Sequence, residues 1–182
     1  LRDRVQVGRL VAWCHYQNIV IPVYRGLKAE SALAEKLRGH LKGQVKALTG
    51  HSLYQTKVLR ELLETFNAEG MPVMVLKGTG LDVWLYGGPG HRPAADHDLM
   101  VPPSCVPGAV SLLQEAGYTC SDSNWSPSSG TNDPDYHAPP FRKSENGTTS
   151  SVELHWRLNA EDRTQLVDNA RSVTEDMWAR AE

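Results

Sequence analysis

The chain has 182 residues, of which 19 are Lys or Arg and 21 are Asp or Glu, so its formal net charge is −2. This near-balance argues against a general binder of nucleic acids or anionic membranes, because no excess of positive charge is present to neutralise phosphates. Its apolar runs are far shorter than the roughly 20 residues of a membrane-spanning helix. Three scattered cysteines indicate neither a disulfide framework nor a zinc site, so we expect a reducing, cytoplasmic setting.

Residues 1–70 are predicted to form a helical region. Two apolar stripes with helical spacing predict two helices separated near Gly50. The stretch Val5–Tyr24 is also predicted to be helical, with a break at Pro22. The first stripe consists of Leu33, Leu37, Leu41, Val45 and Leu48, and the second of Val58, Leu59, Leu62, Leu63 and Phe66.

The pattern changes at Met71 to short strands that alternate with short helices. The strands are expected at residues 71–77, 96–101, 118–120, 137–143 and 149–157, and the helices at 81–86, 106–116 and after 159. Asn146-Gly147 is a strong hairpin turn signal, and the polar residues 121–135 are typical of a loop. We therefore predict an α+β fold with a helical domain at residues 1–70 and a second domain at 71–182.

Asp96 and Asp98 are the most informative residues for chemistry. Residues two apart on a strand share a face, so these carboxylates lie side by side and repel each other unless a cation lies between them. A site built from oxygen ligands suits Mg²⁺ or Mn²⁺ better than zinc. The alternative is a solvated strand end. Because of the repulsion, we expect the loss of one carboxylate to stabilise the metal-free fold slightly.

Two further signals accompany the aspartates. Lys77-Gly78-Thr79 joins a strand to a short helix, and backbone amides at such a turn, with the lysine ammonium, favour an anion. Arg92 lies on the loop just before the aspartates, where it could bind phosphate. An ordinary turn with exposed basic side chains is the alternative for both.

Glu153 is a candidate third acid. In Val152–Trp156 the apolar residues alternate with polar ones, which places Glu153 and His155 on the face opposite the core. If this strand neighbours the aspartate strand, Glu153 joins the pair. A polar, solvated strand face is the alternative.

These residues resemble the uncharacterised nucleotidyltransferase family of the DNA polymerase β superfamily. The resemblance covers roughly residues 69–158 and extends more loosely over the preceding helices. It rests on the segments Val75–Gly78, Leu85–Tyr86, Pro89–Arg92, Asp96–Leu99, Gly117–Tyr118 and Val152–Trp156.

The resemblance implies a minimal nucleotidyltransferase core, namely a mixed sheet flanked by helices. It makes Asp96, Asp98 and Glu153 the catalytic metal ligands, and the segment Lys77–Thr79 and Arg92 the nucleotide-binding residues. The chain departs from the superfamily in having Lys77-Gly78 at the turn, a wider gap before the aspartates and His97 between them. We expect His97 to be a hydrogen-bonded core residue.

The implied reaction is metal-dependent transfer of a nucleotidyl group, AMP from ATP, to an acceptor hydroxyl with release of pyrophosphate. The acceptor is open among a small molecule, a peptide and a protein, while the acidic balance disfavours nucleic acid. One alternative is a non-catalytic module that binds a nucleotide or a partner. Another, a histidine-based metallohydrolase, lacks the usual ligand spacing. Because the chain starts at Leu1 and ends in a charged helical pattern, we expect a truncated C-terminus.

Overall fold

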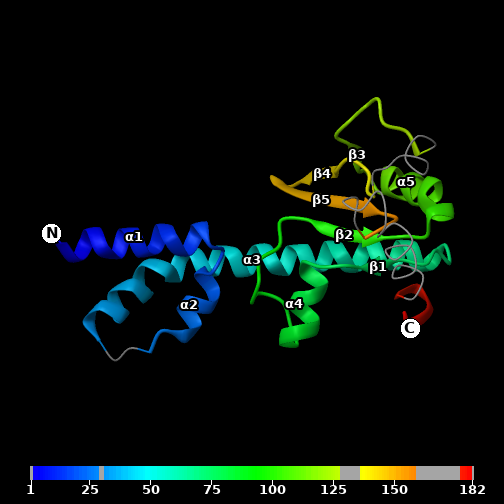
Figure 1. Ribbon diagram of the computed structural model, residues 1–182. Helices are drawn as coiled ribbons and strands as arrows, with labels where there is room; N and C mark the ends of the chain where they lie inside the picture. Colours follow the sequence, from blue (N-terminus) through cyan, green and yellow to red (C-terminus); the bar gives the residue numbers. More distant parts are fainter. Residues whose placement is uncertain (1, 29–30, 128–135, 159–176, 182) are drawn as a thin grey trace, which may run out of the picture. The chain divides into compact units, whose positions relative to one another are not determined.

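The computed structural model describes residues 2–28, 31–127, 136–158 and 177–181 (Figure 1). The helices are α1 (Arg2–Tyr16), α2 (Val20–Gly26), α3 (Ala32–Ala68), α4 (Thr79–Tyr86) and α5 (Val106–Glu115), with a 3-10 turn η1 at Pro103–Cys105. The strands are β1 (Met74–Val75), β2 (His97–Met100), β3 (Thr119–Cys120), β4 (Phe141–Glu145) and β5 (Thr148–His155). The helical N-terminal region and the mixed sheet confirm the predicted α+β class.

The chain forms two compact units, and each takes residues from two separate stretches of the sequence. Unit 1 comprises Leu1–Lys57 and Thr79–Ala94, and unit 2 comprises Val58–Gly78 and Ala95–Glu182. The domain boundary predicted at residue 70 stays a prediction. None of the described helices is both long enough and apolar enough to cross a membrane.

Unit 1 is held together by an apolar cluster between its first three helices. The buried members are Val7, Cys14, Val20, Leu37 and Leu41. The predicted break at Pro22 is wrong in position: the chain turns at Asn18, whose φ is 55°, and α2 then begins at Val20. Pro22 lies in the first turn of α2, where its missing N–H has no helical partner to lose.

The helix break predicted at Gly50 is also wrong, because α3 continues through it for 37 residues. Gly50 is not among the described glycines with positive φ, so it does not form the left-handed cap that ends many helices. A glycine inside a helix costs about 1 kcal/mol relative to alanine. The buried residues Leu41 and Leu62 lie before and after it, and packing of such positions offsets this cost.

Unit 2 contains a five-stranded sheet with the order β1-β2-β5-β4-β3. The β2–β5 pair is parallel, whereas the other neighbours are antiparallel. The hairpin predicted at Asn146-Gly147 is confirmed: both residues have positive φ, 51° and 76°, and they join β4 to β5. Among the described strand pairs, the parallel pair joins the residues that lie farthest apart in the sequence, such as His97 and Val152.

The two faces of this sheet differ in polarity. On one face Leu99, Val152 and Leu154 are fully buried, and α5 contributes buried apolar residues of its own. The other face carries Asp98, Glu153 and His155, because successive residues of a strand point to opposite faces. The helix expected after residue 159 lies mostly outside the described residues, although 177–180 are helical. Residues 128–135 of the expected loop also lie outside them.

Candidate functional site

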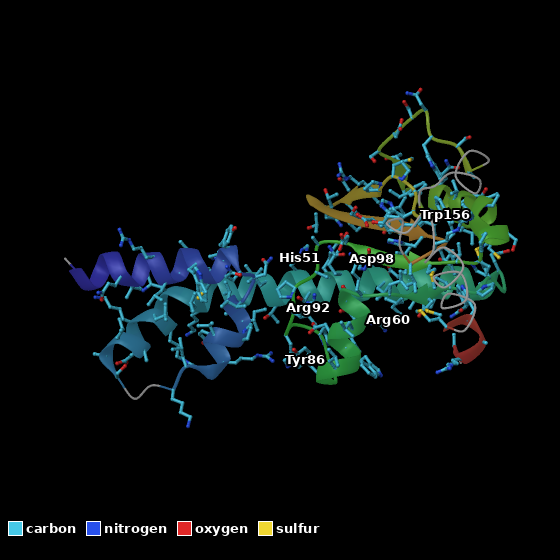
Figure 2. The ribbon with its side chains drawn as sticks, in the orientation of Figure 1. His51, Arg60, Tyr86, Arg92, Asp98 and Trp156 are labelled. Carbon is cyan, nitrogen blue, oxygen red and sulfur yellow. The ribbon has the colours of Figure 1, made fainter. Side chains whose placement is uncertain are left out.

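The parallel pairing of β2 with β5 brings two predicted acids together. Asp98 is the direct register partner of Glu153, although 55 positions separate them in the sequence. The Asp98 side chain is completely buried, whereas that of Glu153 is 26% exposed. In Figure 2 Asp98 is labelled on its strand among the side chains of unit 2. The pair therefore joins one desolvated carboxylate to one that solvent reaches.

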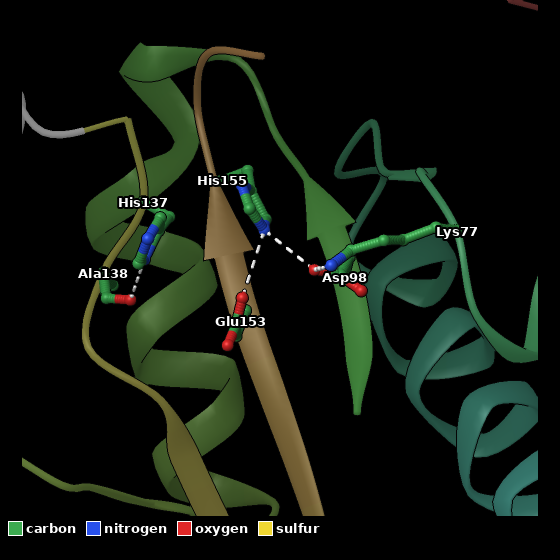
Figure 3. A network of polar contacts seen from close by, with 6 residues as sticks. All are labelled: Lys77, Asp98, His137, Ala138, Glu153 and His155. Carbon is green, nitrogen blue, oxygen red and sulfur yellow. Dashed lines mark hydrogen bonds and ion pairs between the residues drawn. The ribbon is translucent and has the colours of Figure 1, made fainter. Parts of the chain in front are cut away.

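The two oxygens of Asp98 have different surroundings. Lys77 Nζ and His155 Nε2 each lie 3.1 Å from Oδ1 (Figure 3). Oδ2 is buried, and no described residue gives it a hydrogen bond. Buried carboxylate oxygens are normally satisfied, so Oδ2 is the atom of this cluster that a bound cation would complete.

The neighbours of Asp98 favour its ionised form. Burial alone would raise the pKa of the Asp98 carboxyl, but the hydrogen bonds from His155 and Lys77 and their electrostatic attraction together outweigh it and hold that pKa below its ordinary value. The same hydrogen bond from Lys77 to Asp98 raises the pKa of the Lys77 ammonium. Partial burial opposes that rise, and the negative charges of Asp98, Asp96 and Glu153 add to it.

A group of three side chains could hold a metal ion. One ligand atom from each of Asp98, Glu153 and His155 lies within 4.8 Å of the other two. The carboxylate oxygens of Asp98 and Glu153 are ligands of the kind that Mg²⁺ and Mn²⁺ prefer. From the sequence, His155 was considered as a metal ligand only for the alternative metallohydrolase, although its spacing of two from Glu153 indicated that both share a face.

Asp96 has a different position from the one expected. It lies in a bend just before β2 and is half-buried. It does not belong to the close group of Asp98, Glu153 and His155, although its charge acts on Lys77. The assignment of Asp96 as a metal ligand stays a prediction. His97, by contrast, is buried on the face of its register partner Val152, so its expected place in the core is confirmed, while the hydrogen bond expected for it stays a prediction.

The turn before α4 belongs to unit 2 as far as Gly78, and Asp98 and Glu153 belong to the same unit. The backbone N–H of Leu76 donates to the carbonyl oxygen of Asp98 at 3.0 Å, which ties the turn to β2. Gly78 then takes a φ of 70°, a conformation that favours glycine. Lys77 comes directly after the hydrogen-bonded Leu76. Its side chain is 57% exposed, and its ammonium contacts Asp98.

Thr79 and Arg92 belong to unit 1. Thr79 starts α4 and is buried, and Arg92 lies on the loop after α4 with an exposed side chain (Figure 2). The buried carboxylate of Asp82 shapes this loop by accepting the backbone N–H groups of Gly90, His91 and Arg92 at 2.8, 3.2 and 2.8 Å. A nucleotide-binding role for Thr79 and Arg92 stays a prediction.

A family model described as uncharacterised nucleotidyltransferase matches residues 3–182. The chain belongs to this family. The match covers essentially the whole chain and confirms the resemblance stated from the sequence. No curated protein and no solved structure matches the chain. Membership of the uncharacterised nucleotidyltransferase family supports nucleotidyl transfer as the general class of activity, with a nucleotide as substrate, and the group of Asp98, Glu153 and His155 could bind a metal.

Proposed function

We propose that the chain is a metal-dependent nucleotidyltransferase that moves AMP from ATP to an acceptor hydroxyl and releases pyrophosphate. One observation carries this proposal. In a member of a nucleotidyltransferase family, a parallel strand pair places Glu153 beside Asp98, whose Oδ2 is buried and has no hydrogen bond from a described residue. A buried carboxylate oxygen of this kind would coordinate a cation.

The residues divide the chemistry between them. Asp98 and Glu153, with the predicted Asp96, would hold Mg²⁺ or Mn²⁺, which when bound stabilises the negative charge that develops on the phosphate oxygens. Lys77 would exchange its contact with Asp98 for the phosphates of the triphosphate, which the flexible stem and exposed position of its side chain allow. Gly78, Thr79 and Arg92 remain the further predicted nucleotide-binding residues.

The transfer step balances as an in-line displacement. The acceptor oxygen forms a bond to the α-phosphorus while the bond from that phosphorus to the bridging oxygen breaks, and pyrophosphate leaves. The hydroxyl proton passes to a base. Glu153 is the candidate, because it is the acid of the close group that solvent and an acceptor can reach. ATP is the proposed donor because it is the commonest one, and no described contact selects a base.

We place this activity in the cytoplasm. The three cysteines of the chain, Cys14, Cys105 and Cys120, are all free. Free thiols of this kind persist where the compartment is reducing. The acceptor in this setting would be a small molecule, a peptide or a protein.

The proposal is tested with each of the four nucleoside triphosphates labelled at the α-phosphate. The protein is incubated with one triphosphate, Mg²⁺ or Mn²⁺, and a cell extract separated into small-molecule, peptide and protein fractions. We expect label from ATP in one fraction, lost in excess chelator and in both Asp98→Asn and Glu153→Gln. Binding of ATP that is equally tight in chelator, without transfer of label, would instead identify a non-catalytic nucleotide-binding module.

A further inference from the structure

His155 lies at the point where the two acids meet. Its Nε2 is 3.1 Å from Asp98 Oδ1 and 3.8 Å from Glu153 Oε2, and Figure 3 shows this nitrogen directed at both carboxylates. The His155 side chain is only 7% exposed. Such a histidine can either ligate the cation directly or donate a hydrogen bond to a residue that does.

The position of the ring hydrogen separates these two roles. An ionised carboxylate only accepts hydrogen bonds, so Nε2 must carry a hydrogen at 3.1 Å from Asp98 Oδ1. A nitrogen that carries a hydrogen has no lone pair for a metal. To ligate through Nε2, the ring would have to move its hydrogen to Nδ1, which is buried and has no hydrogen-bond partner among the described residues. Histidines that bind metals usually donate from their second nitrogen to a defined acceptor.

We propose that His155 is a positioning residue: it donates Nε2–H to Oδ1 of Asp98 and thereby turns Oδ2 toward the cation, without ligating the cation itself. This assignment rests on the proposed function, because it needs a cation at Asp98. Lys77 occupies the same Oδ1, so both donors contact one oxygen and leave the other for the ion. The resulting site has oxygen ligands only, which favours Mg²⁺ or Mn²⁺ over Zn²⁺.

The surroundings of His155 supply a matched control. His137 forms an isolated β-bridge with His155, and the two ring centroids lie 5.2 Å apart. Nδ1 of His137 donates to the carbonyl oxygen of Ala138 at 2.8 Å, so His137 packs beside His155 without contacting the acids (Figure 3). A substitution of His137 disturbs the packing against the His155 ring but leaves the hydrogen bond from His155 to Asp98 in place.

Mn²⁺ serves as the probe, because its electron spin reports on directly bound nitrogen. Mn²⁺ affinity and spin-echo modulation are measured for the full chain and for His155→Gln, His155→Ala and His137→Gln, with circular dichroism to check the fold. A glutamine amide reaches about as far as Nε2 and can donate the same hydrogen bond. We expect no coupling from a bound ¹⁴N in the wild type, near wild-type affinity in His155→Gln and His137→Gln, and about 10- to 100-fold weaker binding in His155→Ala.

The other outcomes separate the two claims. A ¹⁴N coupling in the wild type that disappears in His155→Gln would make His155 a metal ligand and overturn this assignment, while the metal site itself stood. Unchanged Mn²⁺ affinity in His155→Ala would overturn it as well. If the wild type bound no Mn²⁺, or bound it no better than Asp98→Asn, the proposed function would fail first and the assignment with it.

Discussion

Asp98 has a buried negative charge that depends on its two donors. From the sequence alone, the carboxylates of Asp96 and Asp98 were expected to repel each other, so that the loss of one would stabilise the metal-free fold. The structure changes this expectation, because Lys77 and His155 both donate to Oδ1. Removing the charge of Asp98 weakens two charge-assisted hydrogen bonds, and this loss outweighs the relief of repulsion from the neighbouring carboxylates of Asp96 and Glu153.

We expect Asp98→Asn to lower the free energy of unfolding by about 1–3 kcal/mol, since the amide keeps one acceptor oxygen but adds a buried donor in place of Oδ2. Its rate of nucleotidyl transfer should fall by about 100- to 1000-fold. Urea unfolding and a turnover assay measure the two effects. Glu153→Gln is the control. Because this side chain is partly exposed, the variant should lose as much of the transfer rate as Asp98→Asn, while its free energy of unfolding should fall by less than about 1 kcal/mol. Equal stability loss in both variants would contradict the argument.

The stability of the metal-free protein should depend on pH through the same pair. Because the pKa of Asp98 is lowered in the folded state, its stabilising contribution is present above the ordinary value of about 3.9 and is lost as the pH falls through the folded value. The pKa of Lys77 is raised, so its contribution is present below about 10.4 and is lost as the pH rises further. Urea unfolding of wild type and Asp98→Asn across the pH range should give a stability difference that shrinks below about pH 4. A difference that stays constant there would argue that Asp98 does not lose its charge.

The elements show which local signals could be trusted. The hairpin was predictable because Asn146-Gly147 adopts positive φ at little cost wherever it occurs. Gly50 was misleading, since a glycine ends a helix only if the chain turns away there, and that depends on packing partners far along the sequence. The register of Asp98 with Glu153 was the least predictable feature, because it is set by which strands pair and not by either segment alone.

Two glycines test whether a glycine in this chain is part of a helix or is needed at a turn: Gly50 is helical, whereas Gly78 has a positive φ. We expect Gly50→Ala to raise the free energy of unfolding by about 0.4–1 kcal/mol, because the position is helical and a Cβ there would meet nothing within 4 Å. Gly78→Ala should lower it by about 1–2 kcal/mol, because φ is 70° at the turn before α4. Thermal unfolding followed by circular dichroism compares both with the wild type. If Gly50→Ala were destabilising, α3 would not be continuous at this residue.

At the scale of the whole molecule, the residues that the sequence predicts for the site do not all belong to the same unit. Lys77, Gly78, Asp96, Asp98 and Glu153 belong to unit 2, whereas Thr79 and Arg92 belong to unit 1. A scan along the chain cannot find such a division, because unit 1 takes residues 79–94 from between two stretches of unit 2. The position of His155 against both acids likewise follows from the paired strands and not from its own segment.

This division predicts where a metal ion alone should stabilise the protein. Asp98, Glu153 and His155 all lie on β2 and β5. Mn²⁺ should therefore slow amide hydrogen exchange in those strands of unit 2 and leave the exchange rates of α1 and α2 unchanged. At about 100 times its dissociation constant, an ion that binds only the folded state adds about 2.7 kcal/mol to the free energy of unfolding. Asp98→Asn should remove most of this gain, and excess chelator should remove all of it in the wild type. Equal protection of α1, or a gain that Asp98→Asn retains, would place the ion elsewhere.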